Sequence, residues 1–262
     1  MADATPRQTA QIGPILAAEH LVKRYGGLVA TDDLSIAINA GEIHALIGPN
    51  GAGKTTFVAQ MCGQIPPTSG RILFKGRDIT RLSLPSRARL GITRSFQITS
   101  VLREFTALTN VALAVQAHQG HSFRFWKDSR NDAALTGPAR RFLDVVGLGA
   151  RADVAVSALS HGEQRQLEIA MALAGEPAVL LLDEPMAGMA PEESQRMVGV
   201  LQAIRGTRAI LLIEHDMDAV FALADRITVL VYGRGIATGT PAEIRDNAEV
   251  RRAYLGEESS AG

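Results

Sequence analysis

The residues with the clearest chemistry form a glycine-rich stretch that ends in a lysine and a threonine. In IHALIGPNGAGKTT, over residues 43–56, Gly48, Gly53, Lys54 and Thr55 match the pattern G-x-x-x-x-G-K-[ST]. Glycines let the backbone adopt left-handed conformations, so that successive N–H groups can turn inward around an anion. A helix that begins near Lys54 adds unsatisfied N–H groups and the positive end of its dipole. The stretch therefore predicts a phosphate-binding site.

This pattern is known as a P-loop, and it gives its polar side chains distinct roles. Lys54 can bring a positive charge to the outer phosphates of a nucleotide, and the hydroxyl of Thr55 can bind Mg²⁺. A glycine-rich turn that binds nothing is the alternative, and the order of strand, loop, lysine and hydroxyl disfavours it. The expected nucleotide-binding residues of the loop are Gly48, Pro49, Asn50, Gly51, Ala52, Gly53, Lys54, Thr55 and Thr56.

Two carboxylates follow a continuous apolar run. Asp183 and Glu184 come directly after AVLLL, a run typical of a parallel strand that is covered on both faces. Open α/β sheets bind ligands beyond the carboxyl ends of their strands, so Asp183 is a candidate Mg²⁺ ligand. Glu184 could orient or deprotonate a water beside a γ-phosphate. The alternative is that both acids simply end a strand in solvent, and the P-loop makes that alternative weaker.

A further candidate lies where a second helix is expected to begin, in ALSHGEQRQLEIAMALAGEP. Ser160 as N-cap and Glu163 three positions later make a capping box, and Gly175 with Pro177 marks the helix end. This explanation is structural and does not exclude function. A helix N-terminus with serine and glycine can also bind a phosphate.

Composition restricts the class of protein. The 262 residues contain 27 Lys plus Arg and 27 Asp plus Glu, so no net charge attracts the chain to nucleic acid. The single cysteine, Cys62, excludes an internal disulfide, and its neighbours predict that it faces the core. We find neither a signal-peptide pattern in the first 15 residues nor an apolar run of membrane-spanning length. We expect a chain that does not insert in a bilayer by itself.

The elements that must position these residues follow a strand, helix, strand rhythm, which indicates a doubly wound α/β core. Residues 1–14 are polar and predicted to be disordered. A helix is expected at 191–205, and two short helices at the end of the chain. Expected strands are 15–25, 34–38, 43–47, 71–74, 179–182, 208–213, 227–231 and 235–238.

The pattern becomes helical from about residue 85 to residue 158, which predicts an inserted helical subdomain. Its segment HSFRFW, at 121–126, places three aromatic residues beside Arg124 and Lys127. Such residues could stack on bases and contact phosphates. Aromatic side chains that anchor a loop to the helices are the simpler interpretation.

LSHGEQ, at 159–164, resembles the LSGGQ signature of ATP-binding cassette (ABC) proteins, and the other motifs fall in that family's order over 15–256. The resemblance implies that Tyr25 stacks on adenine and that Gln97 is the Q-loop glutamine. It also implies that Glu184 is the catalytic carboxylate and that His215 is the switch histidine. The implied Mg²⁺ ligands are Thr55, Gln97 and Asp183.

The same resemblance implies the fold class and the domain organisation. We expect an α/β P-loop NTPase with a mixed core sheet, an antiparallel β subdomain and an inserted helical subdomain. Residues 15–262 would form a single ABC ATPase domain, with the helical subdomain, about 85–175, inserted in a RecA-like core.

In that family two cassettes enclose two ATP molecules, each between the P-loop of one subunit and the signature of the other. Ser160, His161, Gly162 and Glu163 would then act in trans, and a second cassette, identical or related, is needed. His161 replaces the usual glycine, and Ala190 replaces the usual Asp or Asn of the D-loop. We expect a modest effect of His161, because some subfamilies tolerate a bulky residue there. We expect Ala190 to change contacts across the dimer and the coupling between the two sites.

Four phrases are similar to ATP-binding subunits of branched-chain amino acid importers: SFQITSVLREFTALTNV, EPMAGMAPEES, LLIEHDM and VRRAYLGEE. This resemblance implies an ATP hydrolase on the cytoplasmic face of the inner membrane. Its partners would be two integral-membrane permease subunits, docked through residues 97–117, and indirectly a periplasmic or extracellular solute-binding protein.

Other functions stay open beside this one. Importers of urea, short amides and aromatic acids share the same phrases. A soluble ABC ATPase of DNA repair or translation usually has a coiled-coil insert or two cassettes, neither of which this sequence contains, and no nucleic-acid partner is expected. A slow nucleotide switch has less need of a positioned Glu184, and a G-protein would carry the N-K-x-D motif.

Overall fold

The computed structural model of the chain describes residues 13–94, 101–118 and 132–258. Three parts of the sequence-based interpretation lie outside these ranges: most of the N-terminal segment, Gln97, and the aromatic segment 121–126. Within the described ranges, no helix is both long and apolar enough to cross a lipid bilayer.

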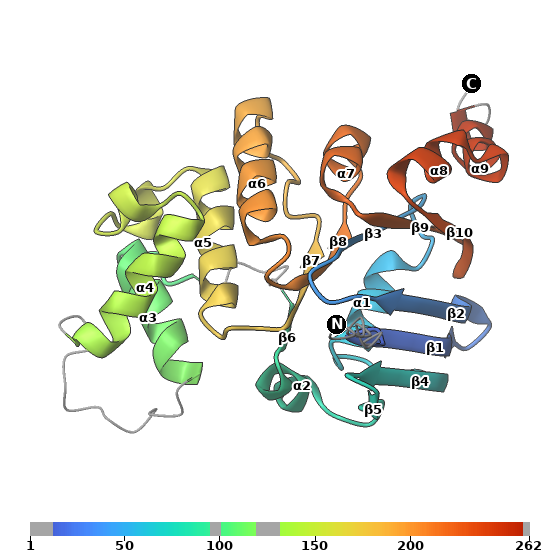
Figure 1. The fold of residues 1–262 in the computed structure, drawn as a ribbon, viewed down its shortest axis with the longest axis horizontal. Helices are drawn as coiled ribbons and strands as arrows, with labels where there is room; N and C mark the ends of the chain where they lie inside the picture. The colour runs from blue at the N-terminus through green and yellow to red at the C-terminus, as the bar shows by residue number, and fades with distance from the viewer. Residues whose placement is uncertain (1–12, 95–100, 119–131, 259–262) are drawn as a thin grey trace, which may run out of the picture.

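Among the described residues, a six-stranded sheet forms the centre of the fold, in the order β10-β9-β3-β8-β7-β6 (Figure 1). Neighbouring strands are parallel except β9 and β10, which form an antiparallel hairpin at one edge. The carboxyl ends of the parallel strands therefore meet at one edge of the sheet, where ligands bind in such folds. The strands are β3 (Ile43–Ile47), β6 (Ile92–Arg94), β7 (Val179–Asp183), β8 (Ala209–Ile213), β9 (Arg226–Val231) and β10 (Arg234–Gly239).

A second sheet is antiparallel, in the order β2-β1-β4-β5, and lies beside the first (Figure 1). This confirms the expected combination of a mixed sheet with an antiparallel one. Its strands are β1 (Leu16–Tyr25), β2 (Leu28–Ile38), β4 (Ser69–Phe74) and β5 (Arg77–Asp78).

β2 is longer than the sequence pattern indicates, because it begins at Leu28 and not at Leu34. Asp32 and Asp33 interrupt the apolar alternation, and Asp33 has a left-handed φ of 55°. The Asp33 carboxylate lies 2.8 Å from Nδ1 of His20 on the neighbouring strand. The strand thus continues through acidic residues that propensity alone would assign to a turn.

α1 (Lys54–Met61) packs between the two sheets and connects their cores. Phe57 is fully buried in one apolar cluster with Leu21 of β1 and Leu46 of β3. Cys62 follows the helix and is 2% exposed, which confirms its predicted inward position. The helix that carries the P-loop lysine is therefore fixed by both sheets.

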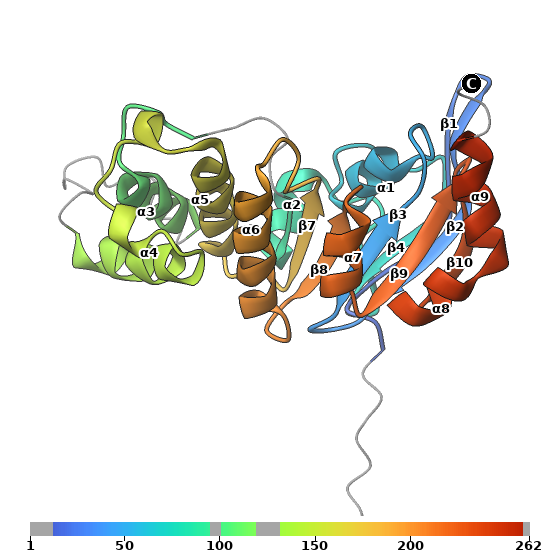
Figure 2. The same cartoon turned by 90° about the horizontal axis from the view of Figure 1, so that it is seen from above.

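The opposite face of the central sheet is covered by helices from the second half of the chain (Figure 2). α6 and α7 pack on β7 and β8, and α8 and α9 lie beside the β9–β10 hairpin. The helix predicted at 191–205 and the two terminal helices are confirmed. Their bounds are α6 (Pro191–Ile204), α7 (Met217–Leu223), α8 (Pro241–Asp246) and α9 (Ala248–Glu258).

Three helices pack on one another at the end of the molecule away from the antiparallel sheet (Figure 1). The expectation of a helical stretch from about residue 85 to residue 158 is wrong at Ile92–Arg94, which form β6 and pair with β7. Three residues are too few for a periodic pattern, so only the pairing identifies this strand. The helices are α2 (Leu84–Leu90), α3 (Ala107–His118), α4 (Ala133–Val145) and α5 (His161–Leu173), of which α3, α4 and α5 form the helical layer.

Arg87 joins α2 to the end of α1, and its side chain is 1% exposed. The guanidinium donates to the carbonyl oxygens of Gln60 (2.8 Å), Met61 (2.9 Å), Thr80 (2.9 Å) and Leu82 (3.1 Å). Burial lowers the pKa of this guanidinium, and the four carbonyl acceptors replace the lost water. Because helix ends leave carbonyl groups without partners, Arg87 satisfies the end of α1.

We expect Arg87→Met to lower the free energy of unfolding by about 2 to 4 kcal/mol, because buried carbonyl groups lose their donor. Urea unfolding followed by circular dichroism measures the change. Arg89→Met is the matched control, since Arg89 is an exposed arginine of the same helix. An equal loss in both variants would contradict the bridging role of Arg87.

Candidate functional site

The P-loop joins β3 to α1 through backbone that favours glycine. The φ angle is 78° at Gly51 and 102° at Gly53. A Cβ atom at Gly53 would collide with the carbonyl oxygen of Ala30 in β2, and a Cβ atom at Gly48 with that of Leu230 in β9. The loop is therefore packed between strands of both sheets and has little freedom to change shape.

The turn between β9 and β10 also holds the loop. The N–H of Gly233 donates to the carbonyl oxygen of Ala52 at 2.9 Å. The carbonyl oxygen of Gly233 accepts from the N–H of Asp32 in β2, also at 2.9 Å. One glycine thus links the P-loop, the central sheet and the antiparallel sheet.

Lys54 points into the loop and is 6% exposed. Its Nζ donates to the carbonyl oxygens of Gly48 at 2.6 Å and Pro49 at 3.0 Å. Thr55 follows at the second position of α1 and is exposed, so its hydroxyl is accessible to a ligand. The ammonium, the loop N–H groups and the N-terminus of α1 form a positive hollow suited to phosphate.

Asp183 ends β7, and its side chain is 3% exposed. Oδ2 accepts from Nη2 of Arg94 in β6 at 2.7 Å. Burial raises the pKa of the Asp183 carboxyl, and the charges of Arg94 and Lys54 oppose that rise. The effect of Lys54 indicates that this carboxylate lies near the P-loop, as the strand order predicts. Arg94 was not recognised in the sequence, because only the pairing of β6 with β7 brings it to Asp183.

Glu184 and His215 lie on neighbouring strand ends and contact each other. Oε1 of Glu184 is 2.9 Å from Nε2 of His215, and both side chains are partly exposed. Glu184 has a φ of 51°, a left-handed conformation that is rare for a residue with a side chain. Such strained residues cluster at active sites, where the surrounding structure fixes them. The two residues that the resemblance pairs are therefore adjacent at the carboxyl edge of the sheet.

Glu214 is a buried carboxylate beside this pair, 4% exposed, and the sequence interpretation assigned it no role. Its Oε1 accepts from the N–H of Met186 at 2.8 Å, and Oε2 accepts from the N–H of His215 at 3.2 Å. Burial raises the pKa of Glu214, and the charges of Glu184 and Asp216 add to the rise. Glu214 thus connects the segment after Glu184 to the backbone of His215. A charged residue that ends the apolar run AILLI is the one signal in the sequence.

Tyr25 ends β1 at the turn into β2 and is 49% exposed. The ammonium of Lys23 lies 5.1 Å from the centroid of its ring. The ring is therefore accessible to a base that stacks on it. It belongs to the antiparallel sheet, whose strand β2 contacts the P-loop through Ala30.

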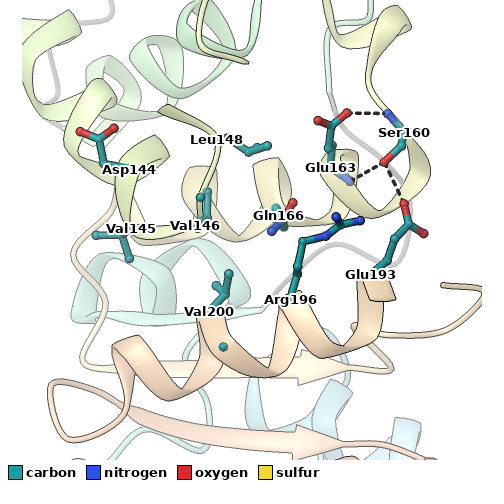
Figure 3. Close-up of a pocket in the computed structure, with 12 residues that line it drawn as sticks. Asp144, Val145, Val146, Leu148, Ser160, Glu163, Gln166, Glu193, Arg196 and Val200 are labelled. Carbon is teal, nitrogen blue, oxygen red and sulfur yellow. Dashed lines mark hydrogen bonds between the residues drawn. The ribbon is translucent and has the colours of Figure 1, made fainter. Parts of the chain in front are cut away.

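Ser160 is the N-cap of α5, and the predicted capping box with Glu163 is confirmed (Figure 3). The Ser160 Oγ accepts from the N–H of Glu163 at 3.2 Å, and Oε2 of Glu163 accepts from the N–H of Ser160 at 2.8 Å. His161 is exposed in the first turn, and a Cβ atom at Gly188, after β7, would lie 3.9 Å from Cε1 of its ring. This group of residues lies on the helical layer, and Ser160 contacts Glu193 of α6.

The P-loop between the two sheets, with acids after β7 and a histidine after β8 at the same edge, is the arrangement of an ATP-binding cassette. The chain belongs to the ABC transporter family, whose model matches residues 31–187. A second model, described as branched-chain amino acid ATP-binding cassette transporter, matches residues 236–260.

Two relatives and one solved structure are similar to almost the whole chain. The chain is 40% identical, over 93% of its length and 98% of the relative's, to the high-affinity branched-chain amino acid transport ATP-binding protein LivG of Salmonella typhimurium. It is 34% identical, over the same shares, to the lipopolysaccharide export system ATP-binding protein LptB of Escherichia coli. The solved ADP conformation of MJ1267, an ATP-binding cassette of an ABC transporter, is 30% identical with a TM-score of 0.80. That alignment covers 92% of this chain and 98% of the solved one.

We expect Gly53→Ala to weaken nucleotide binding at least about tenfold more than Gly51→Ala, because only the former places a Cβ atom against a backbone oxygen. Both positions have positive φ, so the pair controls for backbone strain. Titration with a fluorescent ATP analogue measures affinity, and thermal unfolding checks folding. Equal affinities in the two variants would contradict the packing described for the loop.

Glu214→Gln tests the buried carboxylate. Because burial raises the folded-state pKa of Glu214, wild-type stability decreases as the pH rises through that pKa, whereas glutamine cannot ionise. The variant should therefore gain stability relative to wild type between about pH 4 and about pH 8. Urea unfolding at both pH values measures the difference, with exposed Glu192→Gln as control. A relative loss with rising pH would contradict the assignment.

Proposed function

We propose that this chain is the ATP-binding and ATP-hydrolysing subunit of an ABC importer for branched-chain amino acids or a related small solute. The main support for ATP hydrolysis is the contact between Glu184 and His215. Their side-chain atoms lie 2.9 Å apart at the carboxyl edge of the central sheet, where the P-loop also lies. The likeness to LivG and the match at residues 236–260 support the choice of solute class. The likeness to LptB means that the core of the cassette does not select the solute by itself.

Each residue of the proposed nucleotide site would have a defined role in ATP binding or hydrolysis. The P-loop N–H groups and Lys54 bind the phosphates, and Tyr25 stacks on the adenine. Glu184 holds the attacking water and accepts its proton, which general bases do with rate effects of about 10² to 10⁴. His215 orients Glu184 and reaches toward the γ-phosphate.

The residues present also fit a magnesium ion. Mg²⁺ prefers oxygen ligands and is usually held by one or two carboxylates together with substrate phosphates. Asp183 is a buried carboxylate whose pKa is raised by burial, and a cation would favour its charged form. We propose Thr55 and Asp183 as ligands, with Gln97 outside the described residues as the third. When bound, Mg²⁺ would neutralise charge that develops on the phosphates.

The complete site would need a second cassette. Ser160, His161, Gly162 and Glu163 would contact a nucleotide held by the P-loop of the partner. The unit would span residues 15–262, with the helical layer as an insert whose start lies after β6. It would bind two permease subunits at the cytoplasmic face of the inner membrane, and work indirectly with an external solute-binding protein. Import of urea, amides or aromatic acids is the alternative function of the same assembly.

Glu184→Gln tests the proposal. The variant should bind ATP with unchanged affinity, accumulate as an ATP-dependent dimer, and hydrolyse ATP at least about a hundredfold more slowly. Phosphate release measures turnover, and size-exclusion chromatography with light scattering measures the dimer. Glu192→Gln, an exposed carboxylate on α6, is the control. Unchanged turnover would refute Glu184 as the base, and a wild-type chain without Mg²⁺-dependent ATPase, alone or with its permeases, would refute the function.

A further inference from the structure

The carboxylate of Glu193, which has no role in the hydrolysis proposed above, contacts Ser160 of the signature directly. Glu193 lies in the first turn of α6, and its Oε1 accepts from the Ser160 hydroxyl at 2.9 Å (Figure 3). The same hydroxyl oxygen accepts from the N–H of Glu163. The single proton of the Ser160 hydroxyl, and one of its two lone pairs, are therefore used within one subunit.

Glu193 also covers the signature glycine. A Cβ atom at Gly162 would lie 2.7 Å from Oε1 and Cδ of Glu193, so glycine alone leaves room for the carboxylate. The hydrogen bond from Ser160, and in smaller measure those from the backbone of Ala190 and Gly162, lower the pKa of Glu193. The group is thus an anion at neutral pH, held at the positive end of the 13-residue helix α5.

These contacts are those that a phosphate oxygen would make. A hydroxyl and a backbone N–H at a helix N-terminus form a site for any oxyanion, and a carboxylate competes with a phosphate for the same donors. Two anions cannot share these donors without repulsion. The arrival of one therefore requires the departure of the other.

We propose that Glu193 is an internal competitor at the signature: its carboxylate occupies the anion position in the separate cassette and must leave Ser160 before the partner's nucleotide phosphate binds. The proposal rests on the function proposed above, in which the signature acts in trans. Glu193 thereby raises the ATP concentration that closes two cassettes and prevents closure on weakly binding anions.

The displaced carboxylate could move into a neighbouring cavity. A cavity of about 630 Å³ lies between α4, α5 and α6, and Ser160, Glu193 and Arg196 all line it (Figure 3). Arg196 is three residues beyond Glu193 on the same helix, a spacing that brings opposite charges together. A rotamer change of Glu193 toward Arg196 would free Ser160 without moving the backbone.

The test measures ATP-dependent dimerisation in a Glu184→Gln background, where hydrolysis does not deplete the dimer. The ATP concentration for half-maximal dimer is determined by light scattering for this reference and for Glu193→Ala, Glu193→Gln and Glu192→Ala added to it. We expect a decrease of about three- to tenfold for Glu193→Ala and a smaller decrease for Glu193→Gln, which keeps a weaker hydrogen bond. Glu192→Ala removes the same charge from the same helix turn and should match the reference.

Each outcome decides one question. A half-maximal concentration that is unchanged or higher in Glu193→Ala would overturn the proposal, because Glu193 would then only support the position of Ser160. An equal decrease in Glu192→Ala would also overturn it, because a general charge effect would explain the result. A reference chain that never dimerises with ATP would refute the proposed function itself. ATP affinity of the monomer should be unchanged in all variants, since the P-loop is not altered. Thermal unfolding checks that each variant is folded under the conditions of the test, because Glu193 also accepts from the N–H of Ala190 at the start of α6.

Discussion

The close approach of the P-loop backbone to the carbonyl oxygens of Ala30 and Leu230 is the constraint on which the site depends. Because close-packed protein interiors do not deform gradually, the loop keeps one shape as long as both sheets are in place. Gly233, in the turn between β9 and β10, adds one hydrogen bond to Ala52 of the loop and one to Asp32 of β2. The phosphate hollow and the strand end that carries Tyr25 are consequently fixed relative to each other by backbone contacts, before any ligand is bound.

Around this fixed loop, three carboxylates lie at neighbouring strand ends with different partners. Asp183 pairs with the guanidinium of Arg94, Glu184 meets the imidazole of His215, and Glu214 accepts from backbone N–H groups. Burial raises the pKa of Asp183 and of Glu214, and like charges nearby add to this. A positively charged ligand would relieve that repulsion, so these carboxylates favour a cation together with the phosphates that accompany it.

Local patterns revealed those features that depend on local physics. The P-loop glycines, the acids after an apolar strand and the capping box at Ser160 could be predicted, because each depends on residues close together in the chain. The first part of β2 could not, because Asp32 and Asp33 oppose its strand propensity. Arg87, Arg94, Glu193 and Glu214 were missed for another reason: each has at least one partner that lies far away in sequence, and only the packed fold brings the two together.

The burial of Cys62 has a practical consequence. The chain has one thiol, which lies at the C-terminal end of α1 and is 2% exposed, so we expect it to react slowly with reagents in solvent. A cysteine introduced on the surface would then be the one reactive handle of the subunit. Spin labels or fluorophores attached in this way would report intersubunit distances during the nucleotide cycle without prior removal of the native residue.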